Sequence, residues 1–379
     1  MRTLIVGAGI AGLTLAGLLS RQGRSPVVVD RRPEGADAGY GLALWPHGSR
    51  VLHALGVHDE FVARSEPMRS YVARDGAGRE LITSPMPESI SAYGHLGVID
   101  RADLLGLLRS ALDGVDVREG VGIAGLDQLG DRVDVRFDDG TTESFDVVVG
   151  ADGIHSHVRD LLLGHVPGTD TGWGCYVWWA DSRLAGEGET TERWGAGTFL
   201  GTYPCRDRLC VIAGAPLEVL VADRPAGRAE RRHPGTARPG APVEALLAAL
   251  PGDHEDLFLW RMTDARAPHW VQGRVALVGD AAAAFLPTAG IGASMALESA
   301  AALADELSRT DATYVPHALE LYERRRRHRV EAAQTQSRRL ARVMFLSSPR
   351  LASLRNRALP LASMEQMVAP LINALREPI

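Results

Sequence analysis

The sequence predicts an α/β fold in which a mostly parallel, Rossmann-type sheet is combined with a smaller, largely antiparallel sheet and with C-terminal helices. Two glycine-rich turns, more than two hundred residues apart, each lie between an apolar strand pattern and a helical pattern. Between them, from about residue 166, the chain changes to alternating segments rich in Trp and Tyr, which are typical of an antiparallel sheet. This order predicts a second lobe inserted into a larger α/β domain.

The first turn, Gly7-Ala8-Gly9-Ile10-Ala11-Gly12, follows the apolar run 4–6 and precedes a helical pattern. The three glycines permit a tight turn, the approach of a diphosphate to the backbone, and close packing of the helix on the strand, at a helix N-terminus that favours negative charge. Eighteen residues after Gly12, the strand 27–29 ends in Asp30, whose carboxylate can accept hydrogen bonds from ribose hydroxyls. The turn therefore predicts a site for FAD or NAD.

The second turn, Gly279-Asp280-Ala281-Ala282, follows the strand pattern 275–278 and leads on to Pro287, Gly290 and Gly292. An acidic side chain and free backbone N–H groups at the start of a helix suit the polyol chain and the polar ring edge of a flavin. A plain NAD dehydrogenase needs no such return to its cofactor late in the chain. The two turns together therefore predict FAD.

With these motifs the chain resembles the single-component FAD-dependent aromatic hydroxylases of the p-hydroxybenzoate hydroxylase type over nearly its whole length. The segment Asp152-Gly153-Ile154-His155-Ser156-His157-Val158-Arg159 looks like the family's middle motif, and Asp100-Arg101 is similar to the start of a helix that carries an FAD-contacting Arg. The resemblance implies that FAD is held by Gly7, Gly9, Gly12, Asp30, Arg31, Arg101, Asp152, Gly279, Asp280, Pro287, Gly290 and Gly292. Ala283, Ile291 and Ser294 depart from the family pattern and leave the detailed position of the flavin ring open.

The resemblance also implies an activity. NADPH or NADH reduces bound FAD, O₂ then gives a flavin C4a-hydroperoxide, and one oxygen atom enters an aromatic or polycyclic small molecule, in secondary metabolism. No side chain is required as a covalent nucleophile. Two alternatives stay open: an FAD oxidoreductase of the same fold that does not activate O₂, such as a reductase or cyclase, and a non-catalytic FAD-dependent ligand-binding protein.

Composition excludes several other classes. A net charge of −6 is too small and of the wrong sign for nucleic acid or an anionic membrane surface. No apolar run reaches the roughly 18 residues of a membrane span. All 41 residues counted as Lys+Arg are Arg, so no mechanism with a catalytic Lys applies. The three cysteines form no Cys-x-x-Cys pair, which favours a reduced, cytoplasmic protein. Separately, we expect a monomer or a homodimer.

The length of 379 residues exceeds that of a typical single domain. A hairpin signal near residues 70–82 predicts a pair of strands that joins the substrate side. The expected division is an FAD-binding domain of residues 1–165 and 262–330, a substrate-binding sheet of residues 166–261, and a C-terminal helical segment of residues 331–379.

Candidates for the substrate side are Trp178, Trp194 and Tyr203, which lie in the aromatic segment that in the family roofs the substrate site. An ordinary sheet core explains them equally well. His47 lies in a segment that the family brings near the flavin and is a candidate acid–base group, with a loop histidine as its alternative. Flat aromatic walls with few fixed charges predict a planar, weakly charged substrate rather than a small dianionic acid.

Two further patterns are interpreted as structural. His155 and His157 have a spacing that could suit a metal, but no further ligand is near in the sequence, so we predict no metal site. The run 323–329, which contains five arginines, is interpreted as a solvated helix face.

Overall fold

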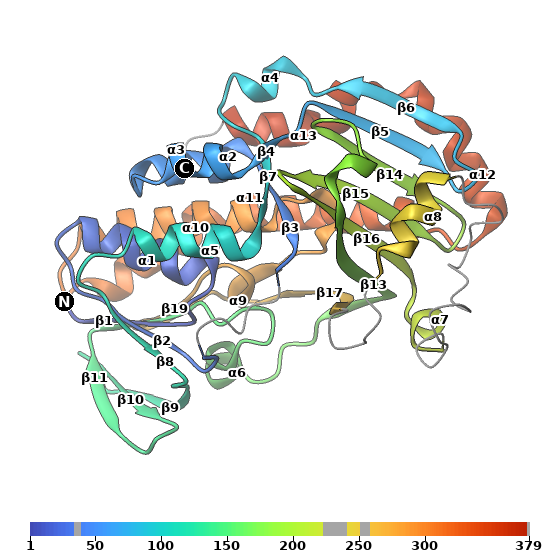
Figure 1. Ribbon diagram of the computed structural model, residues 1–379. Helices are drawn as coiled ribbons and strands as arrows, with labels where there is room; N and C mark the ends of the chain where they lie inside the picture. The colour runs from blue at the N-terminus through green and yellow to red at the C-terminus, as the bar shows by residue number, and fades with distance from the viewer. Residues whose placement is uncertain (34–38, 223–240, 251–257, 377–379) are drawn as a thin grey trace.

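The computed structural model describes residues 1–33, 39–222, 241–250 and 258–376, whose strands form two large sheets and two small ones. Figure 1 shows the two large sheets side by side, with long helices running across them. The first large sheet has the order β18 (Val271–Gln272), β19 (Val275–Leu277), β12 (Val147–Gly150), β1 (Thr3–Val6), β2 (Val27–Asp30) and β8 (Asp116–Glu119).

All neighbours in this sheet are parallel except β18 and β19. Its central strands are continuous runs of buried Val, Leu and Ile, which is typical of parallel strands covered on both faces. The covering helices α1 (Ile10–Arg21) and α10 (Gly292–Ser308) contact each other, and α5 (Arg101–Ser110) contacts α1. This confirms the Rossmann-type α/β fold.

Smaller elements complete this half. One antiparallel sheet contains β9 (Ile123–Gln128), β10 (Val133–Phe137) and β11 (Thr142–Phe145), and shares the core of the parallel sheet. The other small sheet contains β3 (Gly41–Leu44), β4 (Glu66–Pro67) and β7 (Gly97–Asp100). The connecting helices are α2 (Pro46–Ala54), α3 (His58–Arg64), α4 (Glu88–Ser91), α6 (His157–Leu163) and α9 (Asp280–Ala283), with the 3₁₀ helix η3 (Pro287–Ala289).

The second large sheet is antiparallel apart from one parallel pair, β14 with β5. Its order is β17 (Phe258–Arg266), β13 (Thr169–Asp181), β16 (Arg208–Pro216), β15 (Phe199–Cys205), β14 (Glu189–Trp194), β5 (Ser70–Asp75) and β6 (Glu80–Pro85). The hairpin β5–β6 forms one edge of this sheet. The boundary expected at residue 261 falls inside β17, which pairs with β13 on both sides of this residue.

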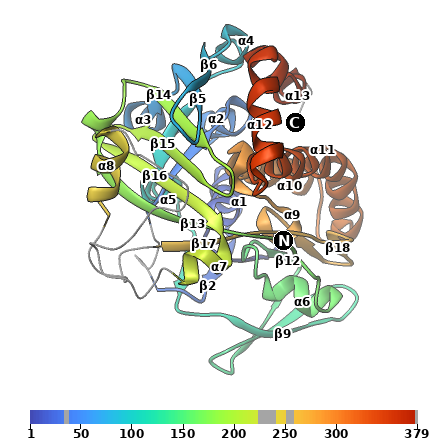
Figure 2. The same ribbon diagram turned by 90° about the vertical axis from the view of Figure 1, so that its right-hand side faces the viewer.

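Helices lie on both faces of the second sheet (Figure 2). One face packs against α8 (Ala241–Ala248), near the 3₁₀ helix η1 (Ser182–Leu184) and α7 (Leu217–Ala222), and the other packs against the end of α11 (Val315–Met344). The chain continues through α12 (Pro349–Ala358), the 3₁₀ helix η4 (Leu359–Leu361) and α13 (Met364–Arg376). No helix in the described ranges is long and apolar enough to span a membrane.

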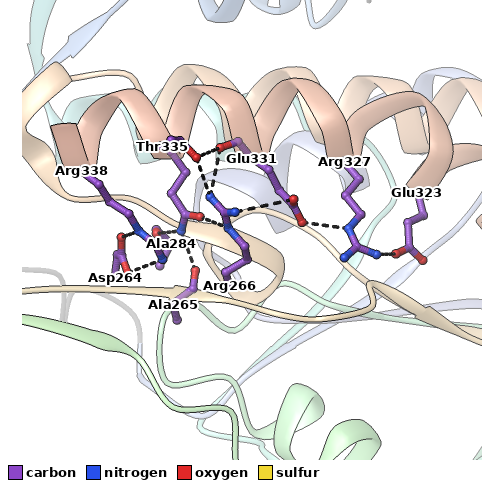
Figure 3. A network of polar contacts seen from close by, with 10 residues as sticks. Asp264, Ala265, Arg266, Ala284, Glu323, Arg327, Glu331, Thr335 and Arg338 are labelled. Carbon is purple, nitrogen blue, oxygen red and sulfur yellow. Dashed lines mark hydrogen bonds and ion pairs between the residues drawn. The ribbon is translucent and has the colours of Figure 1, made fainter. Parts of the chain in front are cut away.

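The long helix α11 joins the two halves. Its first part packs in the core of the parallel sheet and its last part packs on the antiparallel sheet. Figure 3 shows how polar side chains fix it to β17: Arg338 binds the buried Asp264 at 2.6 Å, and Arg266 donates to Thr335. Arg266 also donates to the side-chain oxygen of Gln334 on α11. Gln334 also donates to the carbonyl of Ala284, so the helix holds the segment just after α9.

The arginine run on α11 is not a uniformly solvated face, and that expectation is wrong. Arg326 and Arg329 are buried and bind the two oxygens of Glu298, on α10, at 2.6 and 2.7 Å. Arg324 and Arg325 do lie nearer the surface, with Arg324 72% exposed. The run therefore has two sides, because a helix turns 100° per residue and consecutive arginines cannot share one face.

Candidate active site

One cavity of about 1500 Å³ lies between the two large sheets. Its lining includes the first glycine-rich turn, the middle motif, the late motif, the strands β14 and β15, and α13. It thus brings together segments that are separated by more than three hundred residues in the chain.

The first turn has the geometry of a diphosphate cradle. Gly7 adopts φ +113° and a Cβ there would lie 2.4 Å from the carbonyl oxygen of Ala151, while a Cβ on Gly12 would lie 1.9 Å from the carbonyl oxygen of Gly7. Gly9 is different, since a Cβ there would meet no atom within 4 Å, so its open side faces the cavity. The first turn of α1 has no side-chain cap, which leaves its N–H groups available to an anion.

Asp30 is fixed at the end of β2. Its two carboxylate oxygens accept hydrogen bonds from the backbone N–H groups of Ala8 and Arg32, each at 2.8 Å. Both Asp30 and the exposed Arg31 line the cavity. The carboxylate therefore lies beside the glycine turn, where the ribose of an ADP group would be bound.

The middle motif is organised around Asp152. This carboxylate accepts hydrogen bonds from Ser156 Oγ and from the N–H groups of His157 and Val158, so it holds the first turn of α6 together with the N-cap residue Ser156. The buried Arg159 donates to the carbonyl oxygens of Ile154 and Ala281. The motif thus both lines the cavity and connects it to α9.

Asp280, the first residue of α9, is exposed and lines the cavity. Desolvation by the surrounding protein raises the pKa of Asp280 to about 6, and the positive charges of Arg101 and Arg159 oppose this shift. Arg101 lines the cavity at the start of α5. An acidic side chain flanked by two arginines fits the polyol and ring edge of a flavin.

The rest of the late motif forms a wall beside Asp280. Gly279 adopts φ +62°, and a Cβ on it would lie 2.8 Å from Ala11, so it lets α9 begin close to α1. Pro287, Gly290 and Gly292 line the cavity. The hydroxyl of Thr288 donates to the carbonyl of Ser337 on α11 at 2.9 Å, which fixes this wall in place.

The three departures from the family pattern lie in the core. Ala283 and Ile291 are buried among apolar side chains. Ser294 is also buried, and its hydroxyl accepts a hydrogen bond from the N–H of Trp45 at 2.9 Å. Trp45 lines the cavity, so Ser294 positions part of the wall without reaching the cavity itself.

Of the three aromatic candidates, Trp194 and Tyr203 line the cavity and Trp178 does not. Trp178 lies on the other face of the sheet, where its indole N–H donates to the carbonyl of Leu246 on α8 at 3.2 Å. The expectation that Trp178 lies on the substrate side is therefore wrong, and this residue belongs to the core on the opposite face of the sheet. Successive residues of a strand point to opposite faces, and Trp178 has the parity of the α8 side.

His47 lies in α2, fully buried and outside the cavity lining. Burial, with the charges of Arg329, Arg326 and Arg50, holds the pKa of His47 well below its ordinary value. A group that does not reach the cavity cannot exchange a proton with a substrate there, so the acid–base assignment is corrected. His155 and His157 line the cavity, and no group of three metal-ligating side chains occurs among the described residues.

Two parts of the site were missed in the sequence. One is Glu192, a buried carboxylate on β14 that lines the cavity between Trp194 and Tyr203. Its alternation with Trp194 along the strand was the available signal. The other is α13, which contributes Met364, Met367, Val368 and Leu371, and whose position nothing in the local sequence indicates.

Comparison with known proteins agrees with this geometry. Residues 1–337 match the family model for the FAD binding domain. The chain is 33% identical to the 3-amino-4-hydroxybenzoate 2-monooxygenase PtmB3 of Streptomyces platensis, over 95% of this chain and 93% of that protein. It is 30% identical to the 3-hydroxybenzoate 6-hydroxylase 1 of Aquipseudomonas alcaligenes, over 93% of this chain and 92% of that protein.

A solved structure extends the comparison. Klebsiella pneumoniae HpxO, in complex with FAD and uric acid, superposes with a TM-score of 0.88 and 25% identity, over 99% of this chain and 96% of that one. FAD is thus the cofactor of this site, as the two glycine-rich turns predicted. The relatives are monooxygenases and hydroxylases. Nothing in these comparisons favours the two alternatives, an oxidoreductase that does not activate O₂ and a non-catalytic binding protein. The chain belongs to the FAD-dependent aromatic hydroxylases, the flavoprotein monooxygenases that insert one oxygen atom into an aromatic small molecule.

Proposed function

We propose that this protein hydroxylates a planar, weakly charged aromatic compound beneath Trp194 and Tyr203, with NADPH or NADH as a transient electron donor. The observation that supports this most is the continuity of the cavity from the glycine turns to the antiparallel sheet. Away from the glycine turns, the cavity is lined by the aromatic side chains of Trp194 on β14 and Tyr203 on β15 and by apolar side chains of α13. Such a wall suits a flat ring compound.

In this proposal FAD is held by Gly7, Gly9, Gly12, Asp30, Arg31, Arg101, Asp152, Gly279, Asp280, Pro287, Gly290 and Gly292. When bound, FAD supplies electron transfer and oxygen activation. The chain's own part is positioning. Trp194 and Tyr203 orient the ring, and the apolar side chains of α13 exclude water, so that an oxygen atom would be transferred to the substrate rather than lost as H₂O₂.

The nicotinamide donor would share the cavity with FAD and the substrate. The parallel sheet carries the FAD turns and the antiparallel sheet carries the substrate wall, so neither large sheet is left for a separate nicotinamide site, and the nicotinamide would enter the same cavity transiently. We further propose a reduced, cytoplasmic setting, because Cys175, Cys205 and Cys210 are buried free thiols. A monomer or a homodimer and a role in secondary metabolism complete the proposal.

The test is a steady-state assay of the FAD-loaded protein with NADPH and with NADH in parallel. We expect an aromatic substrate to raise the rate of NAD(P)H oxidation, with O₂ consumed in step. Oxidation that proceeds under nitrogen with an organic acceptor and consumes no O₂ in air would instead indicate a reductase. A rate that no ring compound raises with either nucleotide would also contradict the proposal.

A matched pair of tryptophans tests the substrate wall. Trp194→Ala opens the cavity beside the substrate, so we expect more of the consumed O₂ to appear as H₂O₂. Trp178→Ala removes an equal side chain from the other face of the same sheet, and we expect it to lower thermal stability without changing coupling. H₂O₂ yield per NAD(P)H and melting temperature are measured for both. Equal coupling in the two variants would place the substrate elsewhere.

A further inference from the structure

We propose that Glu192 selects the substrate by the polar group that the substrate ring presents to it. The carboxylate accepts a hydrogen bond from an aromatic amine or ring N–H group and disfavours aromatic carboxylates. This inference rests on the proposed position of the substrate beneath Trp194 and Tyr203. It names the chemical class that this part of the cavity accepts, and it starts from how the carboxylate is held.

Glu192 is 8% exposed and lines the cavity. One carboxylate oxygen accepts hydrogen bonds from Tyr71 Oη at 2.7 Å and Trp194 Nε1 at 2.9 Å, and the other accepts one from Tyr203 Oη at 2.7 Å. Two carboxylate oxygens offer about four acceptor sites. Three neutral donors therefore leave room for one more donor, and the cavity is the open side from which it can come.

The register of the sheet places residues with small side chains opposite Glu192. Across β5, β14 and β15, Glu192 lies in one row with Ala73 and Gly201. Two residues before Glu192 on β14, Thr190 lies opposite Tyr71 of β5. A Cβ on Gly201 would lie 2.7 Å from the Tyr203 ring, so the absence of a side chain there lets Tyr203 reach across to the carboxylate.

The negative charge of this group is not neutralised by a cation. Its three hydrogen-bond partners, Tyr71, Trp194 and Tyr203, are uncharged donors, and Glu192 forms no ion pair within the described part of the chain. Burial, and then the charge of Glu192, raise the pKa values of Tyr71 and Tyr203 well above the ordinary value for tyrosine. Both hydroxyls therefore stay protonated and act as donors to Glu192.

A second observation points to a ligand at the same place. The hydroxyl of Thr190 is buried, its residue lines the cavity, and it has no hydrogen-bond partner among the residues that the structure describes. Buried polar groups are nearly always paired, so an unpaired hydroxyl beside Glu192 indicates that a polar ligand group completes the site.

These contacts decide the class of ligand. An amine or ring N–H can donate to Glu192 without adding negative charge, and a protonated amine also compensates the buried carboxylate. A ring carboxylate would place a second negative charge beside the first in a desolvated site, and it has no donor to offer. The carboxylate thus selects for donors and against acids.

The experiment measures binding to the FAD-loaded protein through the change in flavin absorbance. The probes are 3-aminophenol and 3-hydroxybenzoate, which share a ring hydroxyl and differ in the second group. We expect the wild type to bind 3-aminophenol about tenfold to a hundredfold more tightly, which is the range for a hydrogen bond to a charged group. In Glu192→Gln we expect the two affinities to become similar, because the amide can donate as well as accept.

The control is Glu189→Gln, on the same strand but outside the cavity lining, which removes the same charge and should leave the preference unchanged. The proposal is overturned if the wild type shows no preference for 3-aminophenol or binds neither probe. It is also overturned if E192Q keeps the preference of the wild type. If E192Q does not fold, the wild-type ratio alone decides. Because binding is measured, an amine preference without NAD(P)H oxidation would refute the proposed function and leave this inference standing.

Discussion

Glu298→Ala is expected to destabilise the protein by roughly 3–5 kcal/mol, the cost of removing one partner from a buried ion pair. The carboxylate of Glu298 is completely buried and binds Arg326 and Arg329, which are also buried, at 2.6 and 2.7 Å. Without it, two desolvated arginines would face each other beside the buried His47. Urea unfolding monitored by tryptophan fluorescence and circular dichroism measures the change.

The matched control is Glu320→Ala, which removes a carboxylate whose partner on the same helix, Arg324, is mostly exposed. An exposed pair contributes about 0–1 kcal/mol, so this variant should unfold close to the wild type. Equal unfolding midpoints for the two variants would mean that the buried cluster is not needed to hold α10 against α11.

Asp280→Ala is expected to weaken FAD binding by about tenfold to a hundredfold, which corresponds to the loss of a hydrogen bond to a charged acceptor, about 1.5–3 kcal/mol. Arg324→Ala, on the exposed side of α11, is the appropriate control. Arg326 cannot serve, since it is buried against Glu298. Quenching of flavin fluorescence on titration of the apoprotein gives both affinities, and equal values would contradict the role of Asp280.

The same carboxylate predicts a pH dependence of FAD affinity. The pKa of Asp280 is raised to about 6 by desolvation, so lowering the pH through this value protonates the side chain and replaces an acceptor with a donor. We therefore expect affinity to fall as pH falls, over roughly one unit either side of the pKa. Asp280→Asn carries no proton to titrate, and its affinity should not change in this window. A wild type that behaves like D280N would contradict the assignment.

The fold and the cofactor half of the site could be predicted because their signals are local. Gly7 and Gly12 are required by close approaches within a few residues of a strand end, and Asp280 follows directly on a buried strand. The hairpin at β5–β6 likewise depends on a short turn. Such features are encoded where they act, so the residues themselves identify them.

The substrate half could not be predicted because it depends on which strands pair. Trp178 and Trp194 are both tryptophans in the same aromatic segment, so the sequence does not distinguish them. Only the pairing of the seven strands shows that their side chains lie on opposite faces of the sheet. The sequence also left open whether Arg326 and Arg329 are buried or solvated. They lie on the same face of the helix as three buried residues, Tyr322, Val330 and Ala333. That spacing indicated burial, but the partner, Glu298, comes from another helix.

The central claim is that oxygen from O₂ enters a ring compound held in this cavity. The direct measurement is mass spectrometry of the product formed under ¹⁸O₂, with the FAD-loaded protein, NAD(P)H and the ring compound that most stimulates NAD(P)H oxidation. One ¹⁸O atom per product molecule is the result that this account predicts. A product that carries no label from ¹⁸O₂, or that takes its oxygen from H₂¹⁸O, would contradict it.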